Sequence, residues 1–256
     1  MGLYIEKDII DKSKPTVIIV HGIGEHSGRY LHVKNALNKA GYNVVRYDQR
    51  GHGKSTYPLG KLKSFHQLID DLKLIVDDVK LDSKKVFLLG HSMGGLVVNL
   101  YAAKYGDISG IISSGAATKT PKNAKILKYI GFWYLRWLKV GIKNVVEGLS
   151  RDKEVAIKYE NDPLVLNKFS ISLIGEMFIK GVKYLHKNID KINVQILYLH
   201  GEKDPIVPAS NSKFMYQNIS VNDKELIIYE GALHEIYNES NKEEVISDTI
   251  KWLNKH

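Results

Sequence analysis

Short apolar runs alternate with longer stretches of helical periodicity along most of this chain. Runs such as TVIIV at 16–20 and VFLL at 86–89 are apolar throughout, which is typical of strands buried on both faces of a sheet. Alternation of such strands with helices indicates a mostly parallel sheet built from βαβ units. We therefore predict an α/β protein with helices on both faces of its sheet.

The pattern predicts six strands and five helices. The strands are expected at 16–20, 42–47, 86–89, 108–113, 194–200 and 226–229. The helices are expected at 30–40, 65–80, 93–105, 208–217 and 242–253. A chain of 256 residues that is 44% hydrophobic can build one large sheet with its covering helices.

Residues 118–191 interrupt this alternation with a long, basic and aromatic segment that has no clear strand. Of the net charge of +9, residues 119–191 carry 15 Lys and Arg against 7 Asp and Glu, or +8, and the remainder carries 22 against 21. The positive charge is therefore a local surface, not that of a nucleic-acid-binding protein. We predict a helical cap at 118–191, inserted between two parts of the core, 1–117 and 192–256.

Composition restricts the chemistry further. The chain has no cysteine, which excludes disulfides and thiolate metal sites. It has no apolar run of the roughly 18 residues that span a bilayer, and its N-terminus is too polar for a secretory signal. We therefore expect a cytoplasmic protein.

The sequence GHSMG at 90–94 matches the G-x-S-x-G pattern of a nucleophile elbow, a sharp turn between a strand and a helix that exposes a serine hydroxyl. The context fits, since VFLL precedes the motif and the helical LVVNLYAAKY follows it. The glycines are needed because larger neighbours would clash in this strained turn. Ser92 is the candidate nucleophile.

A developing oxyanion needs preorganised hydrogen-bond donors close to the nucleophile. The turn HGIG at 21–24 follows the first strongly apolar strand, where this type of sheet places its second oxyanion donor. The candidates are the backbone N–H groups of Ile23 and Met93. The turn could instead bind phosphate, but no G-K-[ST] follows it.

A serine nucleophile also needs a base and an acid. Asp204 follows the strand expected at 194–200, and His234 follows the one at 226–229, so the order Ser92, Asp204, His234 is that of α/β-hydrolases. His234 would take the serine proton, and Asp204 would orient its imidazole. Glu202 is a nearby competitor for the acid, and His52 a weaker candidate for the base. No histidine spacing indicates zinc, and no cofactor is expected.

Taken together, several motifs resemble those of the monoacylglycerol lipase and lysophospholipase family: HGIGEHSGRY, YDQRGHGKS, GHSMGG, YENDPLV, GEKDPIVP and YEGALHEIYNE. The resemblance implies an α/β-hydrolase fold with a helical lid, and it supports the same triad and oxyanion donors. It also implies that Glu25 and Arg29 hold the loop after the oxyanion turn in shape. The chain departs from the family in two places. Members of the family usually begin with a longer antiparallel hairpin, whereas only residues 3–10 are available for it here, and the first half of the cap matches the family only loosely.

The function expected from the resemblance is hydrolysis of a monoacylglycerol, or a related lysolipid or carboxylic ester, through an acyl-enzyme on Ser92. The aromatic, cationic stretch at 125–139 could lie at a lipid interface or pack on the core. Two other functions are open: a prolyl aminopeptidase, which the basic cap disfavours because such enzymes hold a free amine with acidic groups, and a non-catalytic binding module, which would not need a triad.

Overall fold

The computed structural model describes residues 2–124, 127, 132, 134–141 and 146–256. Its centre is a seven-stranded sheet in the order β1-β3-β2-β4-β5-β8-β9, in which β1 alone is antiparallel to its neighbour. The mostly parallel sheet is therefore confirmed. The strands are β1 Tyr4–Asp8, β2 Thr16–Val20, β3 Asn43–Asp48, β4 Val86–His91, β5 Gly110–Ser114, β8 Gln195–Gly201 and β9 Lys224–Tyr229.

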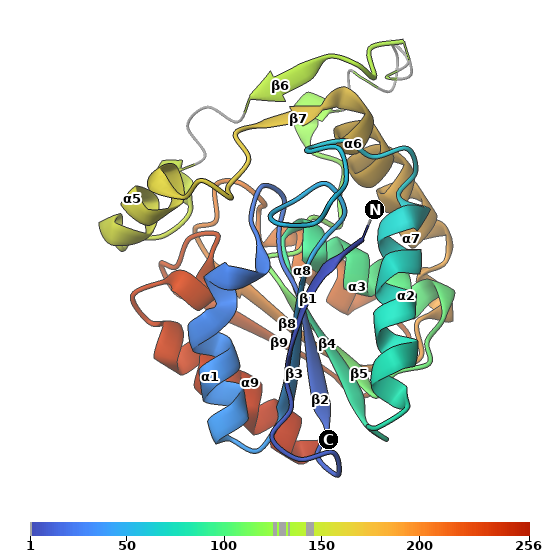
Figure 1. Ribbon diagram of the computed structural model, residues 1–256, viewed down its shortest axis with the longest axis vertical. Coiled ribbons are helices and arrows are strands. Elements are labelled where there is room, and N and C mark those ends of the chain that lie inside the picture. The colour runs from blue at the N-terminus through green and yellow to red at the C-terminus, as the bar shows by residue number, and fades with distance from the viewer. Residues whose placement is uncertain (1, 125–126, 128–131, 133, 142–145) are drawn as a thin grey trace.

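Helices cover both faces of the sheet (Figure 1). Side chains of β2 pack alternately, Ile18 into the core on one face and Ile19 into the core on the other. Among the helices of the described residues, none is long and apolar enough to cross a membrane. One face is covered by α1 Leu31–Lys39 and α9 Lys242–Lys255, the other by α2 His66–Lys80, α3 Met93–Lys104, α7 Val182–Lys187 and α8 Ser210–Asn218.

All six predicted strands and five predicted helices are present, with bounds within two residues of those expected. The largest difference in kind is at the first helix, where a 3₁₀ turn, η1 Ser27–Tyr30, precedes α1. This turn is capped by the His26 side chain, whose Nδ1 accepts the Gly28 N–H at 3.2 Å. Such 3₁₀ turns are common at the ends of α-helices.

β1 is an edge strand of the central sheet. β1 pairs antiparallel with β3 over five residues, from Tyr4 opposite Asp48 to Asp8 opposite Val44. Lys7 on this edge strand pairs with Asp78 of α2 at 2.5 Å. Charged side chains of this kind are common on exposed edges, where they discourage pairing with another chain.

Between β5 and β8 the chain leaves the sheet, and part of it lies beyond the ends of the strands, whereas α7 packs back on one face of the sheet (Figure 1). The prediction that this segment lacks strands is wrong, because β6 Lys139–Gly141 pairs antiparallel with β7 Lys168–Ser170. Three-residue strands are too short to show a two-residue alternation. Part of the aromatic stretch at 125–139 lies outside the described residues. The other elements are η2 Lys122–Ala124, η3 Val146–Gly148, α5 Lys153–Asn161, α6 Ile171–Gly175, the π-helical η4 Glu176–Gly181 and η5 Ile189–Lys191.

Candidate active site

Ser92 occupies the tight turn between β4 and α3. Its backbone has φ 53° and ψ −114°, and it is the one non-glycine residue with positive φ among those described. The turn requires glycines on both sides, since a Cβ on Gly90 would lie 2.3 Å from the Gly94 carbonyl oxygen, and one on Gly94 would lie 2.1 Å from that of Val20. Strained backbone of this kind clusters at functional sites. The elbow geometry predicted from GHSMG is present.

Ser92, His234 and Asp204 form one hydrogen-bonded chain of buried side chains. The Ser92 hydroxyl lies 2.9 Å from Nε2 of His234, and Nδ1 of His234 lies 2.6 Å from Oδ2 of Asp204. With the proton of His234 on Nδ1, the imidazole donates to the carboxylate and accepts from the serine. The sheet brings the three together because they follow β4, β8 and β9, whose carboxyl ends meet at one edge.

The second oxygen of Asp204 is fixed by backbone, as Oδ1 accepts the N–H groups of Ile206 at 2.9 Å and Val207 at 2.8 Å. Burial alone would raise the pKa of Asp204, but the adjacent imidazoles of His234 and His200 hold it well below its ordinary value. Burial would lower the pKa of His234, but the negative charge of the Asp204 carboxylate outweighs burial, so the pKa of His234 lies above its ordinary value. The geometry therefore stabilises an imidazolium facing a carboxylate.

The competing candidates lie elsewhere. The Glu202 carboxylate accepts the backbone N–H of Gly231 at 3.0 Å, on the surface. His52 is fully buried, with its ring 5.4 Å from that of His21, and burial lowers its pKa to about 4. The His91 ring contacts the His234 ring at a tilt of 52°, with centroids 4.7 Å apart, and burial holds the pKa of His91 well below its ordinary value. Both imidazoles are neutral near pH 7 and suited to packing.

The turn at Gly22 and Ile23 lies against the nucleophile, since a Cβ on Gly22 would be 3.2 Å from the Ser92 Cβ. Met93 is the first residue of α3, where backbone N–H groups have no partner within the helix. Within the described part of the chain, neither the Ile23 nor the Met93 N–H donates a hydrogen bond. The positive end of the α3 dipole adds to these two donors.

The loop after β3 holds the oxyanion turn, residues 21–24, through hydrogen bonds. Nε2 of His21 accepts the backbone N–H of Gln49 at 2.9 Å, and its Nδ1 lies 2.7 Å from the Gly22 carbonyl oxygen. Asp48 accepts the N–H groups of Ser27 and Lys54, at 2.8 and 2.7 Å, and so joins the two loops. The motif YDQRGHGKS at 47–55 therefore has a structural role in this loop.

Comparison with known proteins identifies the family. A family model described as serine aminopeptidase, S33, matches residues 11–241. A monoacylglycerol lipase of Mycolicibacterium smegmatis is 30% identical over 251 residues, which are 94% of this chain and 88% of the relative. Human monoglyceride lipase is 30% identical over 236 residues, which are 88% of this chain and 77% of the relative. The chain belongs to the monoacylglycerol lipase-like α/β-hydrolases.

A solved structure agrees with this family. The crystal structure of a Paleococcus ferrophilus monoacylglycerol lipase is 33% identical, with a TM-score of 0.86 over 99% of this chain and 98% of that one. The predicted α/β-hydrolase fold is thereby confirmed, and the chain is a carboxylic ester hydrolase. The family description names a peptidase, whereas these three relatives are named lipases.

In this lipase-like hydrolase, a buried cluster of charged side chains joins two loops. One is the oxyanion loop, which follows β2 and begins with the oxyanion turn, and the other is the histidine loop, which follows β9 and contains His234. Nε of Arg29 lies 3.5 Å from a carboxylate oxygen of Glu25, and its Nη2 pairs with Glu235. Burial, together with the negative charge of Glu235, raises the pKa of Glu25 to about 7. Glu25 and Arg29 thus hold their loop as the resemblance implied. Glu235 was not among the predicted site residues, although its place directly after His234 was a signal.

Residues 148–151 form a second connection, between the segment predicted as a cap and the histidine loop. The backbone N–H of His234 donates to the Gly148 carbonyl at 3.2 Å, and that of Glu235 donates to Leu149 at 2.7 Å. The buried Glu239 carboxylate accepts the N–H groups of Arg151 and Leu233, at 3.2 and 2.8 Å. We call this connection the histidine clamp. Its backbone contacts leave no pattern in a single sequence.

Proposed function

We propose that this chain hydrolyses monoacylglycerols to a fatty acid and glycerol through an acyl-enzyme on Ser92. The observation that carries the proposal is the hydrogen-bonded chain from Ser92 through His234 to Asp204, beside the N–H groups of Ile23 and Met93, which have no hydrogen-bond partner among the residues that the structure describes. The names of the M. smegmatis, human and P. ferrophilus relatives support monoacylglycerol as the substrate class.

In the acylation step, Oγ of Ser92 attacks the ester carbonyl carbon while Nε2 of His234 takes the hydroxyl proton. The carbonyl electron pair moves onto oxygen, and the N–H groups of Ile23 and Met93 stabilise this oxyanion. As the intermediate collapses, the C–O bond to glycerol breaks and His234 gives its proton to the departing oxygen. The Asp204 carboxylate stabilises the imidazolium while it exists.

Deacylation repeats the sequence with water. His234 takes a proton from water as its oxygen attacks the acyl carbon, and the same two N–H groups stabilise the second oxyanion. The bond to Oγ then breaks, Ser92 regains its proton from His234, and the fatty acid leaves. No step needs a metal or an organic cofactor.

Residues 118–191 are proposed to act as a cap over this site and to contact lipid loosely. Its aromatic stretch is divided, since Phe132 is buried, whereas Tyr134 and Trp137 are 84% and 70% exposed. Exposed rings beside cations such as Lys139 suit the interface of a bilayer. We expect cosedimentation with anionic vesicles that falls at high salt; binding no greater than background would rule the contact out.

A substrate panel separates the lipase from a peptidase of the same family. We expect hydrolysis of monoacylglycerols of short, medium and long acyl chain, and the preferred chain length should report on the shape of the cap. We expect no measurable hydrolysis of proline amides. The excess of basic residues at 119–191 supports this expectation, because a free amine is held by acidic groups. Turnover of proline amides with intact monoacylglycerols would instead favour the aminopeptidase that the family description names.

A further inference from the structure

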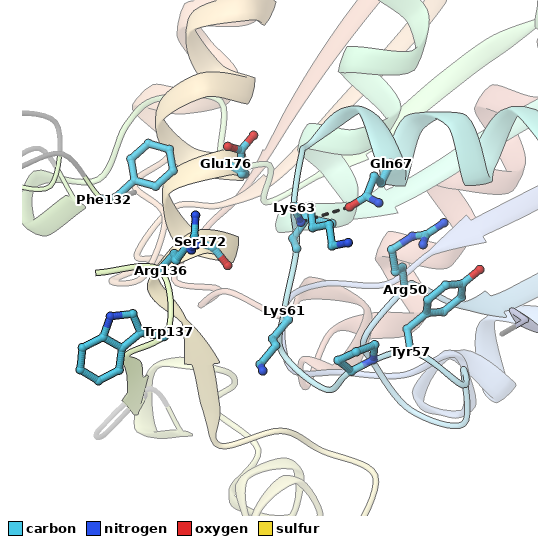
Figure 2. A pocket seen from close by; sticks show the side chains of 12 residues that line it. Arg50, Tyr57, Lys61, Lys63, Gln67, Phe132, Arg136, Trp137, Ser172 and Glu176 are labelled. Carbon is cyan, nitrogen blue, oxygen red and sulfur yellow. Dashed lines mark hydrogen bonds between the residues drawn. The ribbon is translucent and has the colours of Figure 1, made fainter. Parts of the chain in front are cut away.

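A cavity of about 650 Å³ lies between the loop that joins β3 to α2 and the cap segment. Figure 2 shows Tyr57, Lys61 and Lys63 from the loop on one side, and Phe132 and Trp137 from the cap on the other. We call it the basic groove. Its size lies within the range of cavities that bind small organic ligands.

Positive charge predominates among the residues that line the basic groove. Four of its lining residues, Arg50, Lys61, Lys63 and Arg136, are cationic, and Glu176 is acidic. The Glu176 carboxylate is already engaged, since it pairs with Lys180 at 2.5 Å and accepts the Phe65 N–H at 3.3 Å. The groove therefore presents net positive charge to whatever enters it.

The cations of the loop differ in how they are held. Arg50 is fixed by two hydrogen bonds to Asp71, at 2.8 and 2.6 Å, and lies over the ring of Tyr57. Lys61 and Lys63 are exposed, and within the described residues neither amine has an acidic partner. Two unpaired ammonium groups next to aromatic walls suit a ligand with one anionic end and one apolar end.

The basic groove is separate from the catalytic groups. None of the triad residues or oxyanion donors lines it. Residues 166–170 contact both loops: the Ser170 N–H of β7 donates to Gly60 in the groove loop at 2.8 Å, and the Leu166 N–H, just before β7, donates to Gly24 in the oxyanion turn at 2.9 Å. The ester carbonyl under attack at Ser92 therefore lies outside the groove.

We propose that the basic groove binds a long-chain fatty acid, with its carboxylate at Lys61 and Lys63 and its alkyl chain against Phe132 and Trp137. The identity of this ligand rests on the proposed function, because ester cleavage releases an amphiphile of this charge and shape beside the cap. A groove of this size suits one alkyl chain with its head group.

The test is equilibrium dialysis with labelled oleate below its micellar concentration. Ser92 is first blocked with a long-chain fluorophosphonate, so that the catalytic site is occupied. We expect one oleate per chain, and an affinity about tenfold weaker in the double variant Lys61→Glu/Lys63→Glu. The matched control Lys39→Glu/Lys251→Glu makes the same charge change at exposed positions of α1 and α9 and should leave the affinity unchanged.

Neutral methyl oleate provides the second arm, and it should bind blocked wild type about tenfold more weakly than oleate does. Equal oleate affinity in both double variants, equal affinity for the ester, or no oleate binding would each overturn the proposal. A groove variant that loses vesicle binding but keeps oleate binding would assign these lysines to a membrane surface instead. Failure of the fluorophosphonate to label Ser92 would count against the proposed function alone, and the dialysis would then use unblocked protein.

Discussion

Replacing Ser92 with alanine should lower kcat on monoacylglycerols by about 10⁶-fold, because it removes the hydroxyl that forms the acyl-enzyme. The hydroxyl lies 2.9 Å from Nε2 of His234, at the start of α3. Alanine removes that oxygen and keeps the backbone of the elbow. The measurement is single-turnover hydrolysis of a medium-chain monoacylglycerol by both proteins.

Two controls accompany this variant. Ser220→Ala changes an exposed serine in the loop after α8 and should leave kcat unchanged. A fluorophosphonate probe should label wild type and the Ser220 variant but not the Ser92 variant. Labelling that survives in Ser92→Ala would assign the nucleophile to another residue. Wild type that is neither labelled nor active would favour a binding module built on this fold.

Asp204→Asn should lower kcat by about 10⁴-fold while the fold stays intact. The amide oxygen of asparagine can still accept the N–H groups of Ile206 and Val207, which leaves its NH₂ group facing His234. A donor at that place favours the tautomer with the proton on Nε2, which cannot accept a proton from Ser92. The loss should appear in kcat much more than in KM.

The matched variant for this carboxylate is Glu202→Gln, two residues earlier in the same loop. Glu202 accepts the backbone N–H of Gly231 rather than contacting an imidazole, so the kcat of the Glu202→Gln variant should stay near that of wild type. The reverse outcome, a collapse in Glu202→Gln with near-normal Asp204→Asn, would mean that the loop rearranges and that the acid is Glu202. Circular dichroism of both variants separates such a loss from misfolding.

The elements of the core could be predicted because burial on both faces demands continuous apolar strands, and covering helices demand a one-sided stripe. TVIIV and VFLL meet the first demand, and both are strands of the observed sheet. The residues brought together at the site followed from the same reasoning. Loops after parallel strands open at one edge of a sheet, so their polar residues at 92, 204 and 234 had to lie near one another.

The parts that could not be predicted depend on contacts without a local pattern. The pairing of β6 with β7 joins segments 29 residues apart, counting from Lys139 to Lys168, through three residues each. The histidine clamp uses carbonyl and N–H groups that every residue carries. The basic groove needs the loop after β3 to face the cap, which is a property of the assembled molecule. Glu235 is the exception, since its position beside His234 was visible.

The histidine clamp also limits how the enzyme could be re-engineered or diversified. The cap segment looks like an exchangeable module, inserted between two strands of a finished sheet (Figure 1). However, Gly148 and Leu149 supply the carbonyl groups that satisfy the N–H groups of His234 and Glu235. In a chimera whose whole cap came from a relative, the carbonyl groups that accept the N–H groups of His234 and Glu235 would therefore come from the relative's sequence. An exchange that begins after Arg151 would vary the rest of the cap and leave the Gly148 and Leu149 contacts in place.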